Sequence, residues 1–435
     1  MAKARKRPLG ITALTVSGYK SIRDECRIEI RPLTILAGAN SSGKSSAMQP
    51  LLLLKQTLQA PYDPGALLLD GPNVRMTMAE QVLSCVPGTG RADSFGVCIS
   101  LSEPVDLELL FRPLPGRGFM VEQMVHLNRE TGQRFCLRRN LTEKGIRAIL
   151  EAFPPPFGSP DDAPEYTVER NRCFLELHHR KLGQETPGKL SYAGQFGELI
   201  RSVIHVPGLR GNPLRTYPIG ATDSDLPGTF ENYAASVVYD WQRSKSPMLK
   251  KLGESLETLG LTWKIAAKPI DETQVELRVG RLPHSARGGA RDLVSIADVG
   301  FGVSQALPAL VALLKAQPGE LVYIEQPELH LHPRAQTALA HVLADAARRG
   351  VKVVAETHSP LLLLGVQSLV AEKELSPDLV ILHWFERQKD GSSKVTSAEL
   401  DRAGAFGDWP QDFGEVELSA ESRYLDAAEQ VGGGE

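Results

Sequence analysis

Residues 38–45 read GANSSGKS, and this stretch matches the pattern G-x-x-x-x-G-K-[ST] at every fixed position. An apolar run at 33–37 precedes it and a leucine-rich segment at 46–58 follows it, which predicts strand, glycine turn and helix in that order. Glycines let the backbone wrap tightly, so that successive amide N–H groups and the helix N-terminus face phosphate oxygens. We therefore interpret residues 38–45 as a phosphate-binding P-loop rather than a chance turn.

The loop predicts a nucleotide and a metal ion as ligands. We expect Lys44 to reach the β and γ phosphates and Ser45 to bind Mg²⁺. The residues expected to surround the phosphates are Gly38, Asn40, Ser41, Ser42, Gly43, Lys44, Ser45 and Ser46. The sequence contains no N-K-x-D or T-K-x-D motif of the kind that reads guanine, and the expected cofactors are ATP and Mg²⁺.

A second candidate segment, LVYIEQPELHLHP, ends an apolar run with Glu325. We predict that Glu325 holds Mg²⁺ opposite Ser45. Gln326 follows where many ATP-hydrolysing proteins carry an acid; its amide can orient a water molecule but cannot take its proton at neutral pH. Glu328 is the next acid, and it either faces the γ-phosphate or interacts with backbone amides at a helix start. We expect slow ATP hydrolysis; a purely structural Glu328 would favour an ATP-held switch over a catalyst.

Composition sets broad limits. The chain has 435 residues, 42% hydrophobic and 23% charged, and a net charge of −3, which predicts a globular protein of two or three units with no overall attraction to nucleic acid. Five cysteines without a C-x-x-C pair favour a reducing compartment over a disulfide or zinc framework. Apolar runs are too short to span a bilayer, so we expect a cytoplasmic protein without a membrane partner.

Hydrophobic patterns predict the order of the elements. Alternation predicts strands within 11–37, 93–112 and 119–139, and helical spacing predicts helices within 230–259 and 303–316. Strand, helix and strand should follow from about 321 to 359, with the two strands parallel and joined by a right-handed crossover. We interpret the basic stretches at 134–147 and 178–181 as solvent-exposed surfaces rather than as sites that bind a phosphate backbone.

Three later motifs suggest a family. DVGFGVSQ at 298–305 resembles a degenerate ABC signature loop, IEQPELHLHP resembles the Walker B and D-loop region, and VVAETHSP at 353–360 places His358 at the switch-histidine position. Together with SGYKSIRD at 17–24 and an arginine-bearing segment at 205–218, the chain resembles the AAA-15/AAA-21 group of ABC-type ATPases. That group is related to the ATPase module of OLD nucleases and, more distantly, to SMC proteins.

The resemblance implies an α/β fold: an ABC-type P-loop ATPase head with a mixed sheet, split by a large α+β insertion. The implied parts are an ATPase lobe with the P-loop (9–130), an insertion and lid region (131–290), a lobe with signature, Walker B and switch histidine (291–400) and a tail (401–435). It also implies that Gly302 and Ser304 cover the γ-phosphate bound to a second copy. The group assigned to catalysis is Glu325, Gln326, Glu328 and His358.

The expected function is a slow ATPase whose ATP-dependent dimer or higher oligomer regulates a separate effector, a nuclease or toxin, in antiphage defence. One alternative is an SMC-like repair ATPase that clamps DNA, for which residues 140–290 lack the sustained heptads of long arms. Another is a nucleotide-gated scaffold that does not hydrolyse ATP. The sequence leaves open whether the protein binds DNA. Among several candidates for a Q-loop glutamine, Gln81 is the best placed.

Overall fold

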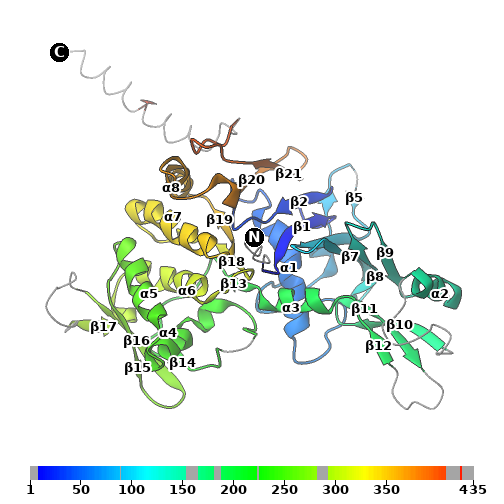
Figure 1. Ribbon diagram of the computed structural model, residues 1–435, viewed down its shortest axis with the longest axis horizontal. Helices are drawn as coiled ribbons and strands as arrows, with labels where there is room; N and C mark the ends of the chain where they lie inside the picture. Colours follow the sequence, from blue (N-terminus) through cyan, green and yellow to red (C-terminus); the bar gives the residue numbers. More distant parts are fainter. Residues whose placement is uncertain are drawn as a thin grey trace, which may run out of the picture.

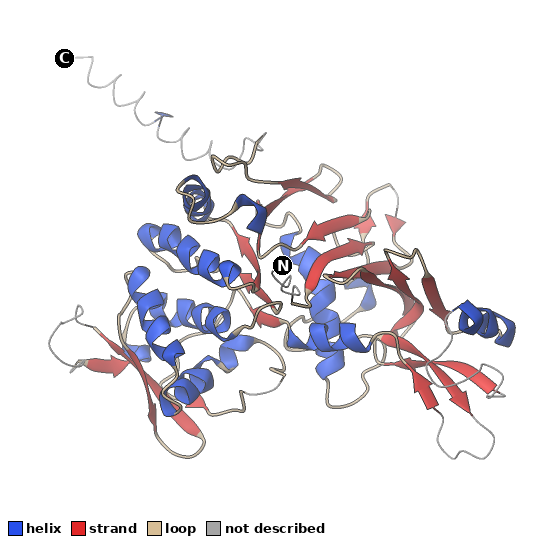
Figure 2. Ribbon diagram, in the orientation of Figure 1, coloured by secondary structure: helices blue, strands red, loops and turns tan. Residues whose placement is uncertain are grey.

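The computed structural model describes residues 8–88, 90–152, 165–180, 188–222, 225–281, 292–407 and 422–423. In this part of the chain, two six-stranded sheets flank one helix, and two smaller α+β regions extend to either side (Figures 1 and 2). Within the described residues, no helix is both long and apolar enough to cross a membrane.

The central sheet has the strand order β13-β18-β19-β3-β20-β21, in which the first five strands are parallel and β21 is antiparallel to β20. These strands are β13 (Ile204–Val206), β18 (Leu321–Glu325), β19 (Lys352–Thr357), β3 (Leu33–Gly38), β20 (Val380–Arg387) and β21 (Ser393–Ala398). Helix α7 (Pro333–Arg348) joins β18 to β19, so the predicted unit of two parallel strands and a helix is confirmed.

Alternating residues of β3 divide the core into two parts. Leu33 and Ile35 pack into a cluster with the helices α6 (Phe301–Lys315), α7 and α8 (Pro360–Ala371). Leu36 packs into another cluster with α1 (Lys44–Gln59). Helix α1 and helix α6 therefore cover opposite faces of the central sheet (Figure 1).

The other six-stranded sheet is antiparallel, with the order β2-β1-β6-β7-β8-β9, and its apolar face packs on α1. Its strands are β1 (Ile11–Ser17), β2 (Cys26–Glu29), β6 (Phe95–Leu101), β7 (Val105–Leu114), β8 (Gly118–Asn128) and β9 (Arg134–Arg138). The strands predicted from alternation are confirmed. Because α1 lies between two sheets, its residues 51–58 are buried all round, as its leucine-rich sequence indicates.

Two smaller regions complete the described fold. One contains α2 (Glu143–Ala152), β10 (Glu165–Asn171), β11 (Phe174–Arg180), β12 (Gly188–Leu190) and α3 (Gly194–Ser202). The other contains β14 (Tyr217–Pro218), α4 (Ala234–Arg243), α5 (Pro247–Thr258), β15 (Ile265–Pro269), β16 (Gln274–Gly280) and β17 (Leu293–Ser295). Strands β4 (Cys85–Val86) and β5 (Gly90–Arg91) form a short hairpin.

The predicted fold class, an α/β head with a mixed sheet and added α+β regions, is confirmed. The division into parts stays a prediction. Two strands from the predicted insertion, 131–290, belong to the main sheets: β9 pairs with β8, and β13 pairs with β18. The predicted loop at 153–164, the glycine-rich segment at 282–291 and most of the predicted tail lie outside the described residues.

A buried cation lies in the middle of α1. Lys55 is fully buried, and its Nζ donates to the carbonyl oxygens of Arg201 and Leu226, each at 3.1 Å. The Gln59 side chain also donates to both carbonyls. Burial lowers the pKa of Lys55 from 10.5 to about 7, against the opposing effect of Asp225.

The depressed pKa of Lys55 predicts a pH-dependent stability. Between about pH 7 and 10.5 the unfolded chain binds more protons at this group, so the free energy of unfolding should rise with pH by up to about 1.4 kcal/mol per pH unit. Lys55→Met should remove this slope in urea titrations across that window, whereas Lys251→Met, an exposed control on α5, should keep it. An unchanged slope in Lys55→Met would show that burial does not shift this pKa.

Candidate functional site

The P-loop connects β3 to α1 through two glycines. A larger residue at either position would displace neighbouring atoms. Gly38 and Gly43 have φ values of 143° and 103°, in the region that favours glycine. A Cβ atom on Gly43 would lie 2.2 Å from the Ser393 Oγ, and one on Gly38 would lie 2.3 Å from the Phe385 carbonyl oxygen. The loop therefore lies directly against β20 and β21.

Hydroxyl groups support the loop from behind. The Ser393 hydroxyl lies 2.6 Å from the Ser42 carbonyl oxygen and 2.8 Å from the Ser21 Oγ. The Ser393 amide donates to the Ser21 carbonyl. The Ser42 Oγ is buried and has no hydrogen-bond partner among the described residues. The loop is thus held from behind by Ser393, and one of its own buried polar atoms has no partner in the described part of the chain.

The lysine of the loop bends back over it. Lys44 is buried, and its Nζ donates to the carbonyl oxygens of Gly38 (3.0 Å) and Ala39 (2.8 Å). Burial lowers the pKa of Lys44, while Glu356 and Glu328 act in the opposite direction. The remaining predicted phosphate contacts lie along the mouth of the loop, where Asn40 and Ser41 are exposed and Ser46 is half-buried on α1.

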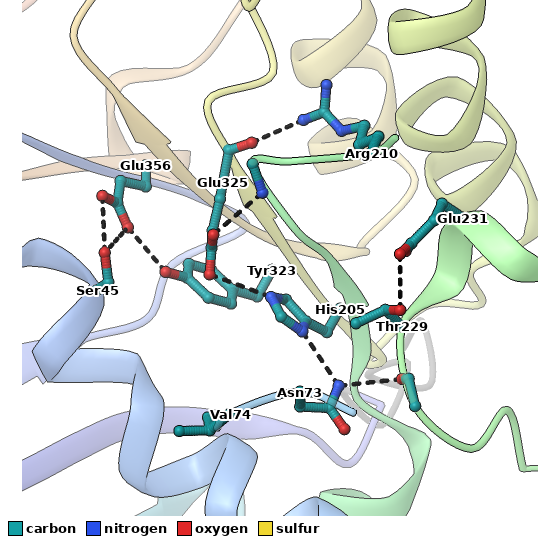
Figure 3. Close-up of polar contacts among 12 residues, drawn as sticks. Ser45, Asn73, Val74, His205, Arg210, Thr229, Glu231, Tyr323, Glu325 and Glu356 are labelled. Atoms are coloured by element: carbon teal, nitrogen blue, oxygen red, sulfur yellow. Dashed lines mark hydrogen bonds and ion pairs between the residues drawn. The ribbon is translucent and has the colours of Figure 1, made fainter. Parts of the chain in front are cut away.

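The structure brings Glu356, rather than Glu325, to Ser45 (Figure 3). The Ser45 Oγ lies 3.0 Å and 2.9 Å from the two carboxylate oxygens of Glu356, and the Tyr323 hydroxyl donates to the same carboxylate at 2.8 Å. Burial raises the pKa of Glu356, and the neighbouring Glu325 adds to this effect. Sequence reasoning missed both Glu356 and Tyr323. The sequence does hold a signal for them, because each is a polar residue within an otherwise apolar strand.

The Glu325 side chain lies on the same face of the sheet as Glu356 but turns away from Ser45, toward His205 of β13 (Figure 3). One carboxylate oxygen lies 3.2 Å from the His205 Nε2, and the other accepts the Gly208 amide at 3.1 Å. Burial raises the pKa of Glu325, but the contacts with His205 and Gly208 and the charge of Arg210 outweigh it, so the net pKa is lowered. The predicted role of Glu325 as metal ligand stays a prediction, and this geometry does not place it beside Ser45.

The residues after β18 form a tight turn. Gln326 has a φ of 45°, which is unusual for a side-chain-bearing residue, and its amide donates to the Glu356 carbonyl at 2.8 Å. Glu328 is buried; its Oε1 accepts the His358 amide at 2.9 Å, while its Oε2 is buried with no partner among the described residues. Glu328 therefore connects the turn to the end of β19. One carboxylate oxygen remains free for a donor on a ligand or water.

These segments line one cavity of about 740 Å³. The P-loop supplies Gly38, Ala39 and Asn40, and the ends of β18, β19 and β20 supply the other walls. Among the predicted site residues, Gln326, Glu328 and His358 face it together. Burial and the nearby Lys44 lower the pKa of His358, and a hydrogen bond with the Gly38 backbone opposes them. The cavity lies at the carboxyl ends of parallel strands, the usual ligand position in open α/β sheets.

Gly302 and Ser304 lie elsewhere, in the first turn of α6 on the opposite face of the central sheet from α1. The Ser304 hydroxyl donates to the Phe301 carbonyl at 3.0 Å, and the half-exposed Phe301 ring lies beside His330. The structure does not bring these two predicted residues together with the P-loop of the same chain.

Two further positions have local roles. The Gln81 side-chain oxygen accepts the amides of Thr77 and Met78 at the surface. His332 caps the start of α7 through a contact with the Arg334 amide. In the part of the chain that the structure describes, no group of three or more histidine, cysteine or acidic residues is arranged to hold a metal ion.

Arg210 joins the segment after β13 to the site. Its guanidinium donates to the carbonyl oxygens of Gln305 (3.0 Å), Glu325 (2.7 Å) and Gln326 (3.2 Å). Burial lowers the pKa of Arg210 to about 10, although Glu328 and other acids act against it. One cation therefore binds the first turns of α6 and the end of β18 at once. The sequence singled out the segment 205–218 but not this contact.

The fold and the site define a P-loop domain of the α/β class. Residues 219–364 match the family described as AAA domain, putative AbiEii toxin, type IV TA system. The matched range contains Ser304, Glu325 and His358, and the P-loop precedes it. A search of curated proteins finds no match.

Solved structures of SMC heads are similar in outline. An SMC head bound to the C-winged helix domain of ScpA shares 14% identity over 91% of this chain and 99% of that chain, with a TM-score of 0.48. The SMC head domain of Thermotoga maritima shares 12% identity over 90% of this chain and 100% of that chain, with a TM-score of 0.38. A Pyrococcus furiosus Smc head with an extended coiled coil, bound to the C-terminal domain of ScpA, shares 13% identity over 90% and 97%, with a TM-score of 0.43.

The contacts of Arg210 predict a large stability effect. Arg210→Met should lower the free energy of unfolding by about 3 kcal/mol, because it removes charge-assisted bonds to buried carbonyl groups. Arg215→Met is the matched control, since this exposed arginine of the same segment pairs only at the surface with Asp298 and should cost less than about 1 kcal/mol. Urea denaturation followed by circular dichroism measures both. Equal losses would show that the Arg210 contacts contribute no special stability.

Proposed function

We propose that the protein binds ATP with Mg²⁺ on its P-loop, hydrolyses it slowly and uses it to associate two heads. The observation that carries this proposal is the cavity at the carboxyl edge of the central sheet. There the glycine loop held by Ser393 and the side chain of Glu328 line one space, and the buried cation of Lys44 bonds the loop from behind through the carbonyl oxygens of Gly38 and Ala39. This combination provides amide donors and a cation for phosphates together with an acid for water.

The residues present fit a bound magnesium nucleotide. The unpartnered Ser42 Oγ and Glu328 Oε2 are buried polar atoms that need a ligand or water. Lys44 would turn from the loop carbonyls to the β and γ phosphates, and Ser45 would contribute a metal ligand. Bound Mg²⁺ neutralises phosphate charge and orients the terminal phosphate. Gly38, Asn40, Ser41, Ser42, Gly43 and Ser46 would complete the contacts.

Slow hydrolysis follows from the side chains after β18. Gln326 can orient a water molecule by hydrogen bonds but cannot accept its proton at neutral pH. Glu328 and His358 both line the cavity, and one buried carboxylate oxygen of Glu328 has no partner among the described residues. Loss of a positioned general base typically costs a factor of about 10² to 10⁴, so turnover is expected well below that of a fast ATPase.

Association of two heads is supported by where α6 lies. Helix α6 covers the face opposite α1, so Gly302 and Ser304 lie apart from the P-loop of their own chain. This separation supports a contact of these two residues with a nucleotide on another copy. Apolar side chains are exposed nearby: Phe301 is 50% exposed, and Leu209, next to Arg210, is 88% exposed. Covering them would favour contact between copies.

A separate effector is the remaining part of the proposal. The description of the matching family names a toxin and a type IV toxin–antitoxin system, which supports a role in which the ATPase controls a nuclease or toxin in antiphage defence. The longest helices in the described residues span 16 residues, as in α1 and α7, so the described part offers no arms of the length that DNA clamping by an SMC-like protein needs.

ATP binding is tested at the loop lysine. Lys44→Ala should weaken ATP binding by about 100-fold, because the charge-assisted bonds to the phosphates are lost. Isothermal titration calorimetry measures the change, and Lys250→Ala, an exposed lysine of α5, is the control. Unchanged affinity in Lys44→Ala would overturn the P-loop assignment.

Head association is tested at the signature serine. With a slowly hydrolysed ATP analogue, the parent should sediment as a larger species, and Ser304→Arg should stay at the smaller size because the long cation obstructs the shared site. Binding of the analogue to the variant's own P-loop should persist. The control is Ser368→Arg on α8, an exposed serine whose hydroxyl likewise bonds a carbonyl of its own helix.

Association of Ser304→Arg equal to that of the parent would remove Ser304 from the contact between heads. ATPase rates of the same samples show whether turnover follows association. A constant rate in Ser304→Arg would mean that each head hydrolyses ATP alone.

A further inference from the structure

We propose that Glu356, together with Ser45, holds the Mg²⁺ that accompanies ATP, and that Glu325 is a positioning residue. This inference rests on the proposed ATP binding and goes beyond it by moving the metal carboxylate from β18 to β19. The observations that carry it are the contacts of the two acids and their places in the sheet.

The sheet order places Glu356 nearer to the P-loop than Glu325. Glu356 on β19 pairs in register with Leu36 of β3 and with Glu325 of β18, so β19 lies between the other two. Neighbouring strands are about 4.8 Å apart. The carboxylate of Glu356 therefore starts one strand from the P-loop strand, and that of Glu325 starts two strands away.

The distances at Ser45 match those of two ligands on one ion. Mg²⁺ binds oxygens at about 2.0–2.1 Å in near-octahedral geometry, which places adjacent ligand oxygens about 2.9 Å apart. The Ser45 Oγ lies 3.0 Å and 2.9 Å from the two oxygens of Glu356. An ion could therefore replace the shared hydrogen with little movement of either side chain.

The surroundings hold Glu356 in this place. Its side chain is buried, and the fully buried Tyr323 donates its hydroxyl hydrogen to Oε2 at 2.8 Å, while the other oxygen, Oε1, lies 3.0 Å from the Ser45 Oγ. A carboxylate among the apolar residues of β19 costs free energy unless it is paired, and a divalent cation is the partner that best offsets this cost.

The Glu325 carboxylate forms its hydrogen bonds on the side of Tyr323 away from Ser45. Both of its oxygens have partners, the His205 ring and the Gly208 amide, and His205 is in turn held by Asn73 at 3.1 Å and stacked on the Tyr323 ring (Figure 3). Turning Glu325 toward Ser45 would break both contacts. Its position suits a residue that fixes the segment leading to Arg210.

The experiment measures how much Mg²⁺ strengthens binding of the non-hydrolysable analogue AMP-PNP, by calorimetry in MgCl₂ and in EDTA. In Glu356→Gln, which keeps the shape and hydrogen-bonding capacity of the side chain, the Mg²⁺-dependent gain should fall by about 10-fold or more while affinity in EDTA is retained. Glu176→Gln, a buried glutamate of β11, is the control and should keep the full gain. Electron paramagnetic resonance of Mn²⁺ with AMP-PNP reports the metal site directly.

If Mg²⁺ strengthens AMP-PNP binding to Glu356→Gln as much as it strengthens binding to the parent, the proposal is overturned. If this effect of Mg²⁺ is lost in Glu325→Gln but kept in Glu356→Gln, Glu325 is the metal ligand. Should Glu356→Gln fail to fold, Glu356→Asp keeps the charge on a shorter side chain. A reduced gain in that variant supports the proposal, and the parent's gain contradicts it. If the parent itself binds no AMP-PNP in either condition, the failure belongs to the proposed ATP binding.

Discussion

The in-register parallel pairing of β18, β19 and β3 determines which side chains can meet at the P-loop. Tyr323 and Glu325 on β18 and Glu356 on β19 share the face of the sheet that α1 covers, because side chains two residues apart point the same way. A shift of β19 by one residue would turn Glu356 to the face of α6 and α7. The contact at Ser45 therefore depends on the register of the whole sheet.

Helix α1 transmits this constraint to the second sheet. Its buried side chains, such as Leu51 and Leu54, belong to the same apolar cluster as Leu14 of β1 and Tyr323 of β18. Because both sheets pack on one helix, the start of that helix cannot shift without disturbing two packed layers. The Ser393 hydroxyl blocks movement from the third side. The phosphate loop is thus preformed by packing on several sides.

Local patterns in the sequence predicted the P-loop, the parallel unit around α7 and the alternating strands, because each depends on neighbouring residues. Strand order is not a local property. Nothing near Glu356 in sequence indicates that it contacts Ser45, 311 positions away, or that Glu325 meets His205, 120 positions away. The prediction assigned the metal to Glu325 because it ends the apolar run LVYIE. The adjacency of β19 and β3 brings another acid closer.

Arg210 connects the two halves of the proposed ATP contact within one chain. A guanidinium group has five N–H donors in a rigid plane, and here they reach carbonyl oxygens of Gln305 in α6 and of Glu325 and Gln326 at the end of β18. If a bound nucleotide shifts the turn at Gln326, the guanidinium must follow or lose a charge-assisted bond. Following it moves the first turns of α6, which carry Ser304. In the proposed dimer, this connection would couple the nucleotide on one head to the position of the surface offered to the second copy.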